Sequence, residues 1–270
     1  MIKLMKKNYY FLLIFPILIN FLTNLNDGNY KFEYLSFYDL ISSLLIFIYF
    51  VLLGYSFKLI NKKMTITIGI ISYLISFFLV EAIALLFYES MNLNTTFIVT
   101  NFLWFIYYIF CLKNRLLLFG IILSYLIMHL FNSQYINLMT VNANLTMDVI
   151  NVFYPNTVSI FENSYKHSVS NPVMMGYPQF MSYIDALIFK ISFSLEKYSF
   201  VLSSSFIFYW LNLLLFFELK ISNKNKIFIC LFFTLLIMNS TWLQFLFTSS
   251  LMSERIAGYL LAGILITLFK

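Results

Sequence analysis

Apolar runs long enough to cross a lipid bilayer follow one another along most of this chain. A membrane-spanning helix needs roughly 20 apolar residues. The sequence offers eight candidate runs, at about 9–25, 38–59, 65–87, 96–112, 116–131, 200–217, 227–238 (extending to about 245) and 256–269. Runs of this length satisfy their backbone hydrogen bonds in lipid as helices. The sequence therefore predicts an all-α fold, a polytopic membrane helix bundle of about eight spans.

Composition excludes an ordinary soluble domain. Hydrophobic residues make up 61% of the chain and charged residues 10%, whereas soluble domains carry about 25% charged residues. The net charge of +6 does not indicate nucleic-acid binding, because most cations stand in short connectors beside apolar runs. Cys111 and Cys230 lie within apolar runs and form no CxxC pair, so neither a disulfide framework nor a zinc site is predicted. We expect the protein to contact the lipid bilayer and not to bind nucleic acid.

The cations predict the orientation of the bundle, because cytoplasmic connectors carry an excess of Lys and Arg. The first run is expected to be a retained anchor rather than a signal peptide, since no small-residue cleavage site follows it. If all eight runs span, one side collects Lys3, Lys6, Lys7, Lys58, Lys62, Lys63, Lys113, Arg115, Lys220, Lys224, Lys226 and Lys270, and the other has Lys31, Lys166, Lys190, Lys197 and Arg255. We therefore expect one transmembrane domain over 1–270, with both termini in the cytoplasm, in a bacterial inner or plasma membrane. Residues 132–196 then form an extracytoplasmic loop.

One segment of that loop has the pattern of an amphipathic helix. Its apolar residues recur at spacings of three and four, and its polar residues fall on the opposite face. The apolar set is Met181, Ile184, Ile188, Ile191 and Leu195, and the polar set is Gln179, Ser182, Asp185, Ser192 and Glu196. Pro178 suits the first turn, where the N–H that proline lacks has no partner to lose. The pattern predicts a helix that lies in the membrane interface and does not span.

Ionisable side chains gather toward the predicted outer half of the bundle. Glu81 lies in the outer half of the third run, Asp39 opens the second, His129 stands near the end of the fifth, and Asp148 follows in the loop. Buried charge in a membrane is costly and needs a reason. One interpretation is a wet cavity open to the outside, and a proton relay through Glu81 and His129 is another. The alternatives are interfacial residence for Asp39 and His129, and a helix-to-helix hydrogen bond for Glu81.

The loop resembles the first extracytoplasmic loop of GT-C fold glycosyltransferases, polytopic enzymes that take sugars from polyprenyl-phosphate donors. The resemblance covers about 148–191, from the acidic Asp148 through NPVMMGYPQFMSYIDALIFKI. In that family an acidic residue is followed by an amphipathic helix and then by a Tyr-Pro-Pro-Leu-like motif that starts a second interfacial helix. Asp148 matches the acidic position. Tyr177 and Pro178 match the Tyr-Pro of the motif, and residues 180–191 match the second interfacial helix. Gln179 replaces the second proline, and here the loop follows the fifth run rather than the first.

The resemblance implies a polyprenyl-phosphate-linked sugar as substrate and roles for individual residues. Asp148 is the candidate catalytic base for the acceptor hydroxyl. Arg255, the only arginine on the predicted outer side, is the candidate for the phosphate, where negative charge develops. The other substrate-binding candidates are Lys166, His167, Tyr177 and Glu81. No cofactor is predicted, and a divalent metal requirement stays open.

Each of these residues also has a structural alternative. Asp148 is also typical of an exposed loop or a helix cap, and Arg255 of a side chain that extends to the membrane surface as an anchor. Lys166 and His167 are also typical of a solvated loop, and Tyr177 of an interfacial helix start. The leading functional hypothesis is a membrane glycosyltransferase with an extracytoplasmic acceptor. The alternatives are a transporter or lipid-handling membrane protein whose loop gates an outward cavity, and a noncatalytic or truncated relative.

Overall fold

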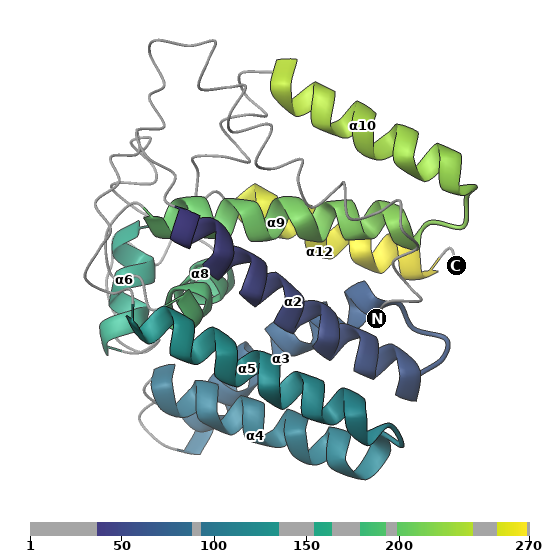
Figure 1. Cartoon of the computed structure of the whole chain (residues 1–270). Coiled ribbons are helices and arrows are strands. Elements are labelled where there is room, and N and C mark those ends of the chain that lie inside the picture. Colours follow the sequence, from purple (N-terminus) through teal and green to yellow (C-terminus); the bar gives the residue numbers. More distant parts are fainter. Residues whose placement is uncertain are drawn as a thin grey trace.

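All regular structure in the described part of the chain is α-helical. The computed structural model describes residues 37–87, 93–134, 154–163, 179–192, 199–239 and 253–268. Its helices are α2 (Phe37–Ile60), α3 (Ile66–Phe87), α4 (Leu93–Cys111), α5 (Arg115–Gln134), α6 (Tyr154–Asn163), α8 (Gln179–Ser192), α9 (Ser199–Glu218), α10 (Asn223–Asn239) and α12 (Ser253–Leu268) (Figure 1). The long helices fall on the apolar runs predicted from residue 38 onward. The run at 9–25 lies outside the described residues.

Two of these helices are long and apolar enough to cross a membrane. The segments that meet this criterion are Ser43–Ile60 in α2 and Ile66–Phe87 in α3. Large apolar side chains also cover the outside of α4 and α5, where Phe110 and Leu116 are each 83% exposed. Extensive apolar surface on a folded chain marks contact with lipid or another apolar partner. These features support membrane association.

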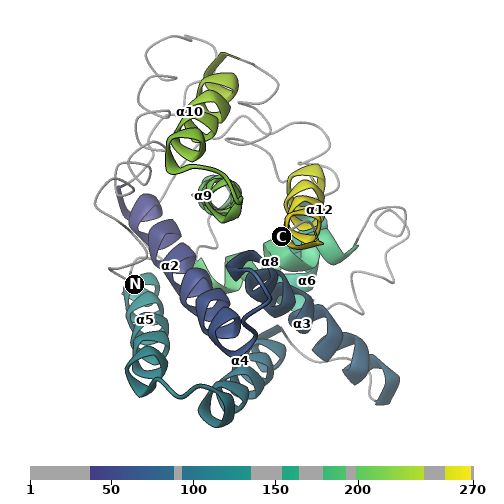
Figure 2. The ribbon, with the colours of Figure 1, turned by 90° about the vertical axis from the view of Figure 1, so that its right-hand side faces the viewer.

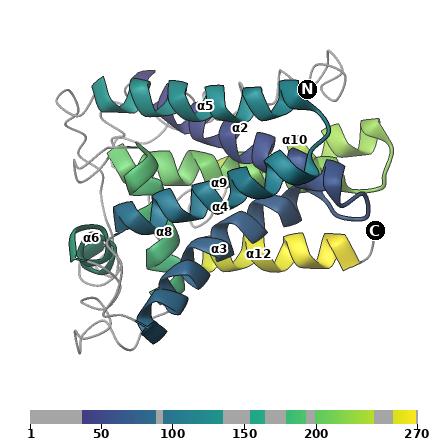
Figure 3. The ribbon, with the colours of Figure 1, turned by 90° about the horizontal axis from the view of Figure 1, so that it is seen from below.

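The long helices run roughly along one axis, and the two ends of the bundle differ (Figure 1). The short connectors 61–65, 112–114 and 219–222 lie together at one end, which we call the connector end (Figure 1). Lys62, Lys63, Lys113 and Lys220 belong to these connectors. Helices α6 and α8 lie at the opposite end, which we call the loop-helix end, and α6 is the outermost of the described helices there (Figure 3). The cationic connectors and the loop helices are thus separated by the length of the bundle.

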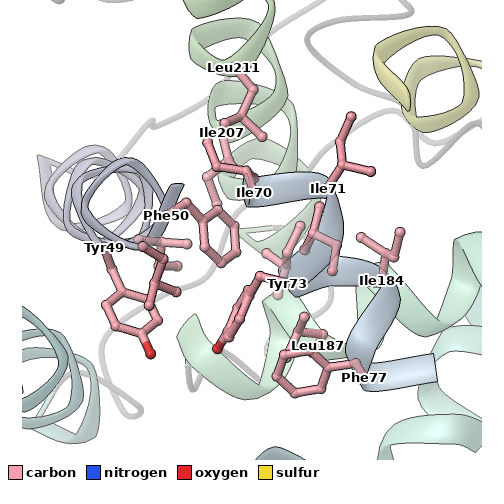
Figure 4. Packing of buried hydrophobic residues seen from close by; sticks show 14 of the residues in the cluster. Tyr49, Phe50, Ile70, Ile71, Tyr73, Phe77, Ile184, Leu187, Ile207 and Leu211 are labelled. Carbon is pink, nitrogen blue, oxygen red and sulfur yellow. The ribbon is translucent and has the colours of Figure 1, made fainter. Parts of the chain in front are cut away.

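Helix α8 is a central element rather than a peripheral one. It contacts α2, α3, α4, α5, α9 and α12, and it lies near the middle of the bundle in the view along the helices (Figure 2). Ile184 and Leu187 of α8 belong to the same buried cluster as Tyr49, Ile70 and Ile207 (Figure 4). The hydrophobic core therefore continues from the long helices into the loop helix.

Glycine sets the separation between α2 and α3. A Cβ added to Gly69 would lie 2.7 Å from the Gly54 Cα, and a Cβ on Gly54 would collide with the carbonyl oxygen of Ile66. Small residues let the backbones of neighbouring helices approach this closely, which is how membrane helices commonly pack. The close approach places the large side chains of α2 and α3 beside one another on both sides of the contact.

A carboxylate from α9 holds the start of α3. Glu218 accepts hydrogen bonds from the backbone N–H groups of Ile66 (2.6 Å) and Thr67 (3.0 Å). These are two of the donors that the first turn of a helix leaves without an internal partner. Lys58 Nζ lies 4.0 Å from the same carboxylate, and the hydroxyls of Thr65 and Thr267 are 2.9 Å apart. At the connector end, α9 and α12 are therefore tied to the α2–α3 turn.

Asn101 connects three helices inside the bundle. Its Oδ1 accepts hydrogen bonds from the hydroxyls of Tyr49 (2.6 Å) and Tyr73 (2.8 Å), and its Nδ2 donates to the carbonyl oxygen of Phe97 (2.8 Å). All of these polar groups are buried. Directional bonds of this kind fix how α2, α3 and α4 are rotated against one another, which apolar contacts alone do not.

We expect the cost of breaking this network to depend on which member is removed. Tyr49→Phe or Tyr73→Phe alone should lower the free energy of unfolding by about 0.6 kcal/mol, a typical value for one interhelix hydrogen bond in a membrane protein. Asn101→Leu should cost about 2–3 kcal/mol, because it leaves two buried hydroxyls without their acceptor. Reversible unfolding of the purified variants in bicelles measures the difference. Equal costs for Asn101→Leu and Tyr73→Phe would contradict the assignment of Asn101 as the shared acceptor.

Candidate functional site

The predicted site residues fall into three groups. Asp148, Lys166, His167 and Tyr177 lie outside the described residues. Arg255 lies in the first turn of α12, at the loop-helix end of the bundle. Glu81 belongs to α3, and its side chain is described. The structure therefore bears directly on Glu81 and on the surroundings of the loop helices.

Glu81 is buried where α3, α4 and α8 meet. Its side chain is 1% exposed, and the Thr96 hydroxyl of α4 donates a 2.7 Å hydrogen bond to its Oε2. The helix-to-helix hydrogen bond that was the structural alternative for Glu81 is thus present. Thr96 was expected only as the start of an apolar run, and nothing in that pattern marked it as a partner of Glu81.

Tyr183 of α8 completes this cluster. Its ring packs edge-on against Phe78, with the ring centroids 6.2 Å apart and the planes at 81°, and Phe78 precedes Glu81 by about one turn of α3. Burial raises the pKa of Tyr183, the charge of Glu81 raises the pKa further, and the Thr96 hydroxyl acts in the opposite direction. The phenol therefore keeps its proton across the physiological pH range.

Two side chains of the polar set predicted for this helix are buried in the bundle. Ser182 and Asp185 are each 1% exposed, and the Asn156 Nδ2 of α6 donates a 3.0 Å hydrogen bond to Ser182 Oγ. Asp185 follows Ser182 by three residues and so shares its face. Thr157 and Ser159 of α6 are also buried. The short helix α6 thus contributes buried polar side chains at the loop-helix end.

The apolar face of α8 points into the bundle. Ile184, Leu187 and Ile188 are fully buried in the main core. With its polar face covered by α6 and its apolar face by the long helices, α8 is enclosed on both sides. The predicted helix over 181–195 is confirmed as an element, but it spans Gln179–Ser192 and packs inside the bundle end.

Two buried carboxylates thus lie at the loop-helix end, Glu81 against α8 and Asp185 on α8 itself. Within the described ranges, no group of three His, Cys, Asp or Glu side chains is arranged to hold a metal ion. Carboxylates accept hydrogen bonds from hydroxyl groups, so this end has the chemistry to orient a hydroxyl-bearing group or to hold protein hydroxyls in place.

Comparisons with known protein families, with curated proteins and with solved structures found no match.

Proposed function

We propose that the chain is a multi-pass membrane protein with its connector end in the cytoplasm and its loop-helix end outside. The observation that carries this proposal is the separation of the cationic connectors from α6 and α8 by the length of the bundle. Cytoplasmic connectors are enriched in Lys and Arg, so the connectors with Lys62, Lys63, Lys113 and Lys220 belong inside. The loop helices then face the extracytoplasmic side.

At that outer end the protein transfers a sugar from a polyprenyl-phosphate donor to an acceptor. The support is the resemblance of 148–191 to the loop of GT-C glycosyltransferases, together with the seating of α8, which begins directly after Tyr177 and Pro178. In this proposal Asp148 is the catalytic base. Arg255, at the start of α12, stabilises the charge that develops on the phosphate, with Lys166 and His167 as further cations. Tyr177 contacts the donor.

Transfer of a labelled sugar from a polyprenyl-phosphate donor in membranes tests the assignment. We expect Asp148→Asn to lower the rate by roughly 10²–10⁴-fold, the usual contribution of a general base. Arg255→Ala should lower it by roughly 10²–10³-fold, which is typical for losing one donor to a developing charge.

Arg115→Ala is the matched control, because Arg115 is the only other arginine and lies exposed at the connector end. It should transfer at the wild-type rate. Transfer that is unaffected by both Asp148→Asn and Arg255→Ala would remove the site assignment. Flux of a solute without sugar transfer would instead favour a transporter.

A further inference from the structure

The exposed charges of the described residues at the connector end are all positive. Glu218 is the one described carboxylate at this end. Its side chain is 4% exposed and already accepts two backbone N–H groups of α3. The exposed cations are Lys62, Lys63, Lys113, Arg115, Lys220 and Lys224. Clustered exposed charges of one sign attract partners of the other sign, so this surface favours an anion.

The 61–65 connector holds two of these cations on a closed turn. The N–H of Met64 donates a 2.9 Å hydrogen bond to the carbonyl oxygen of Asn61, and Lys62 and Lys63 are the central residues of that turn. A backbone that is already fixed loses little conformational entropy when its side chains bind a ligand. The turn therefore presents both lysines at low entropic cost.

The 112–114 connector is fixed in a similar way. Asn114 caps α5, because its Oδ1 accepts hydrogen bonds from the N–H groups of Leu116 (3.1 Å) and Leu117 (3.3 Å). Lys113 directly precedes this cap and is exposed. Its backbone is thus held by the start of α5.

A hydrogen bond joins the first connector to α4, the helix that leads into the second. Asn61 Nδ2 donates to the Tyr107 hydroxyl near the end of α4 (3.0 Å), and Figures 2 and 3 show the two connectors as neighbours. Lys62 and Lys63 from one connector and Lys113 from the other therefore belong to one surface. We call these three side chains the lysine cluster.

Exposed apolar side chains adjoin the lysine cluster. Phe110, at the end of α4, and Leu116, in the first turn of α5, are each 83% exposed and flank Lys113 in the sequence. A soluble anion would neutralise the lysines but leave this apolar surface in water, which is unfavourable. A phospholipid with an anionic headgroup satisfies both, because its acyl chains begin close to its phosphate.

We propose that the lysine cluster binds the headgroup of an anionic phospholipid whose acyl chains lie against Phe110 and Leu116. The lysine ammonium groups donate charge-assisted hydrogen bonds to the phosphate. Each cation near the membrane surface should strengthen the binding of an anionic lipid about fivefold. The inference rests on the proposed placement in a bilayer, but not on which side the connector end faces or on sugar transfer.

Native mass spectrometry of the detergent-solubilised protein measures this preference directly. The protein is titrated with dioleoyl phosphatidylglycerol, which is anionic, and with dioleoyl phosphatidylcholine, which has the same acyl chains and no net charge. The wild type should bind phosphatidylglycerol at least about tenfold more tightly, the effect of several nearby cations reduced by screening. Raising the ammonium acetate concentration from about 0.05 M to about 0.5 M should reduce the preference.

Two double variants with the same change of charge locate the site. Lys62→Ala/Lys113→Ala removes one cation from each connector and should lower the affinity for phosphatidylglycerol by roughly 5- to 25-fold, with the affinity for phosphatidylcholine unchanged. Lys220→Ala/Lys224→Ala should lower it less than about threefold, because exposed charges act over only about 10 Å. This second pair joins α9 to α10, which lie on the other side of α2 from α4 and α5 (Figure 2). Lys62→Arg/Lys113→Arg keeps both charges and should bind as the wild type does.

Equal affinity of the wild type for the two lipids would overturn the proposal, and so would unchanged binding of phosphatidylglycerol by folded Lys62→Ala/Lys113→Ala. Equal losses in the two alanine variants would overturn it too, because net charge rather than a site would then explain the preference. A protein that binds neither lipid would contradict the bilayer placement as well. Absence of sugar transfer together with the expected lipid preference would refute the transferase function and leave the lipid site in place.

Discussion

Replacing Gly69 by alanine is expected to destabilise the protein by about 1–3 kcal/mol, and replacing it by valine by more than about 3 kcal/mol. An added Cβ at Gly69 would lie 2.7 Å from Gly54 Cα and 2.9 Å from Gly54 O. Both are backbone atoms, so relief requires α2 and α3 to move apart. That movement would open the core on both sides of the contact. Reversible unfolding in bicelles, or the thermal midpoint in detergent, measures the loss.

Gly120 is the matched control for this prediction. It also lies inside a helix, α5, but a Cβ there would meet nothing within 4 Å. Because alanine favours a helix over glycine by about 1 kcal/mol, Gly120→Ala should be neutral or stabilising. The two Gly→Ala substitutions are thus expected to have opposite signs. A Gly69→Ala variant as stable as Gly120→Ala would show that α2 and α3 do not pack backbone to backbone.

Replacing Glu218 by alanine is expected to lower the free energy of unfolding by about 3–5 kcal/mol, the usual cost of removing one member of a buried charged group. The change leaves the N–H groups of Ile66 and Thr67 without their acceptor and removes the anion beside Lys58. It also takes a negative charge from the positive end of the α3 dipole. The same unfolding measurement in bicelles gives this value.

The Thr65–Thr267 hydroxyl pair at the same end provides the comparison. Thr267→Val removes one interhelix hydrogen bond between neutral groups and should cost about 0.5–1.5 kcal/mol. Glu218→Gln should fall between the two variants, because it keeps an acceptor oxygen but loses the charge. If Glu218→Ala costs no more than Thr267→Val, Glu218 does not hold the start of α3.

The helices could be predicted from the sequence because their signal is local. The runs expected at 38–59 and 65–87 correspond to α2 (Phe37–Ile60) and α3 (Ile66–Phe87), and the connector between them carries Lys62 and Lys63. Length and apolarity suffice for such elements. The contact between Gly54 and Gly69 depends on which faces of two helices meet, and no local pattern contains that information.

The candidate site could be predicted only in part for the same reason. Glu81 stood out as a carboxylate within an apolar run, and its burial follows from that position. Asp185 was assigned only to the polar face of an interfacial helix, because amphipathic spacing shows that a face is polar but not what covers it. Asn156 of α6, which donates a hydrogen bond to Ser182 on the same face of α8, lies 26 residues earlier in the chain than Ser182. Pairing of two helices across such a distance is a tertiary effect.

The most direct test of the account is the side of the membrane on which the loop helices lie. Two variants each carry a single cysteine in a protein in which Cys111 and Cys230 have been replaced. In one, the cysteine replaces Asn163, the last residue of α6. In the other, it replaces Lys63, an exposed residue of the connector end. A membrane-impermeant maleimide is then applied to intact cells. We predict labelling of Asn163→Cys in intact cells, and labelling of Lys63→Cys only after the membrane is made permeable. The reverse pattern would place α6 and α8 in the cytoplasm and contradict both the topology and the proposed transferase.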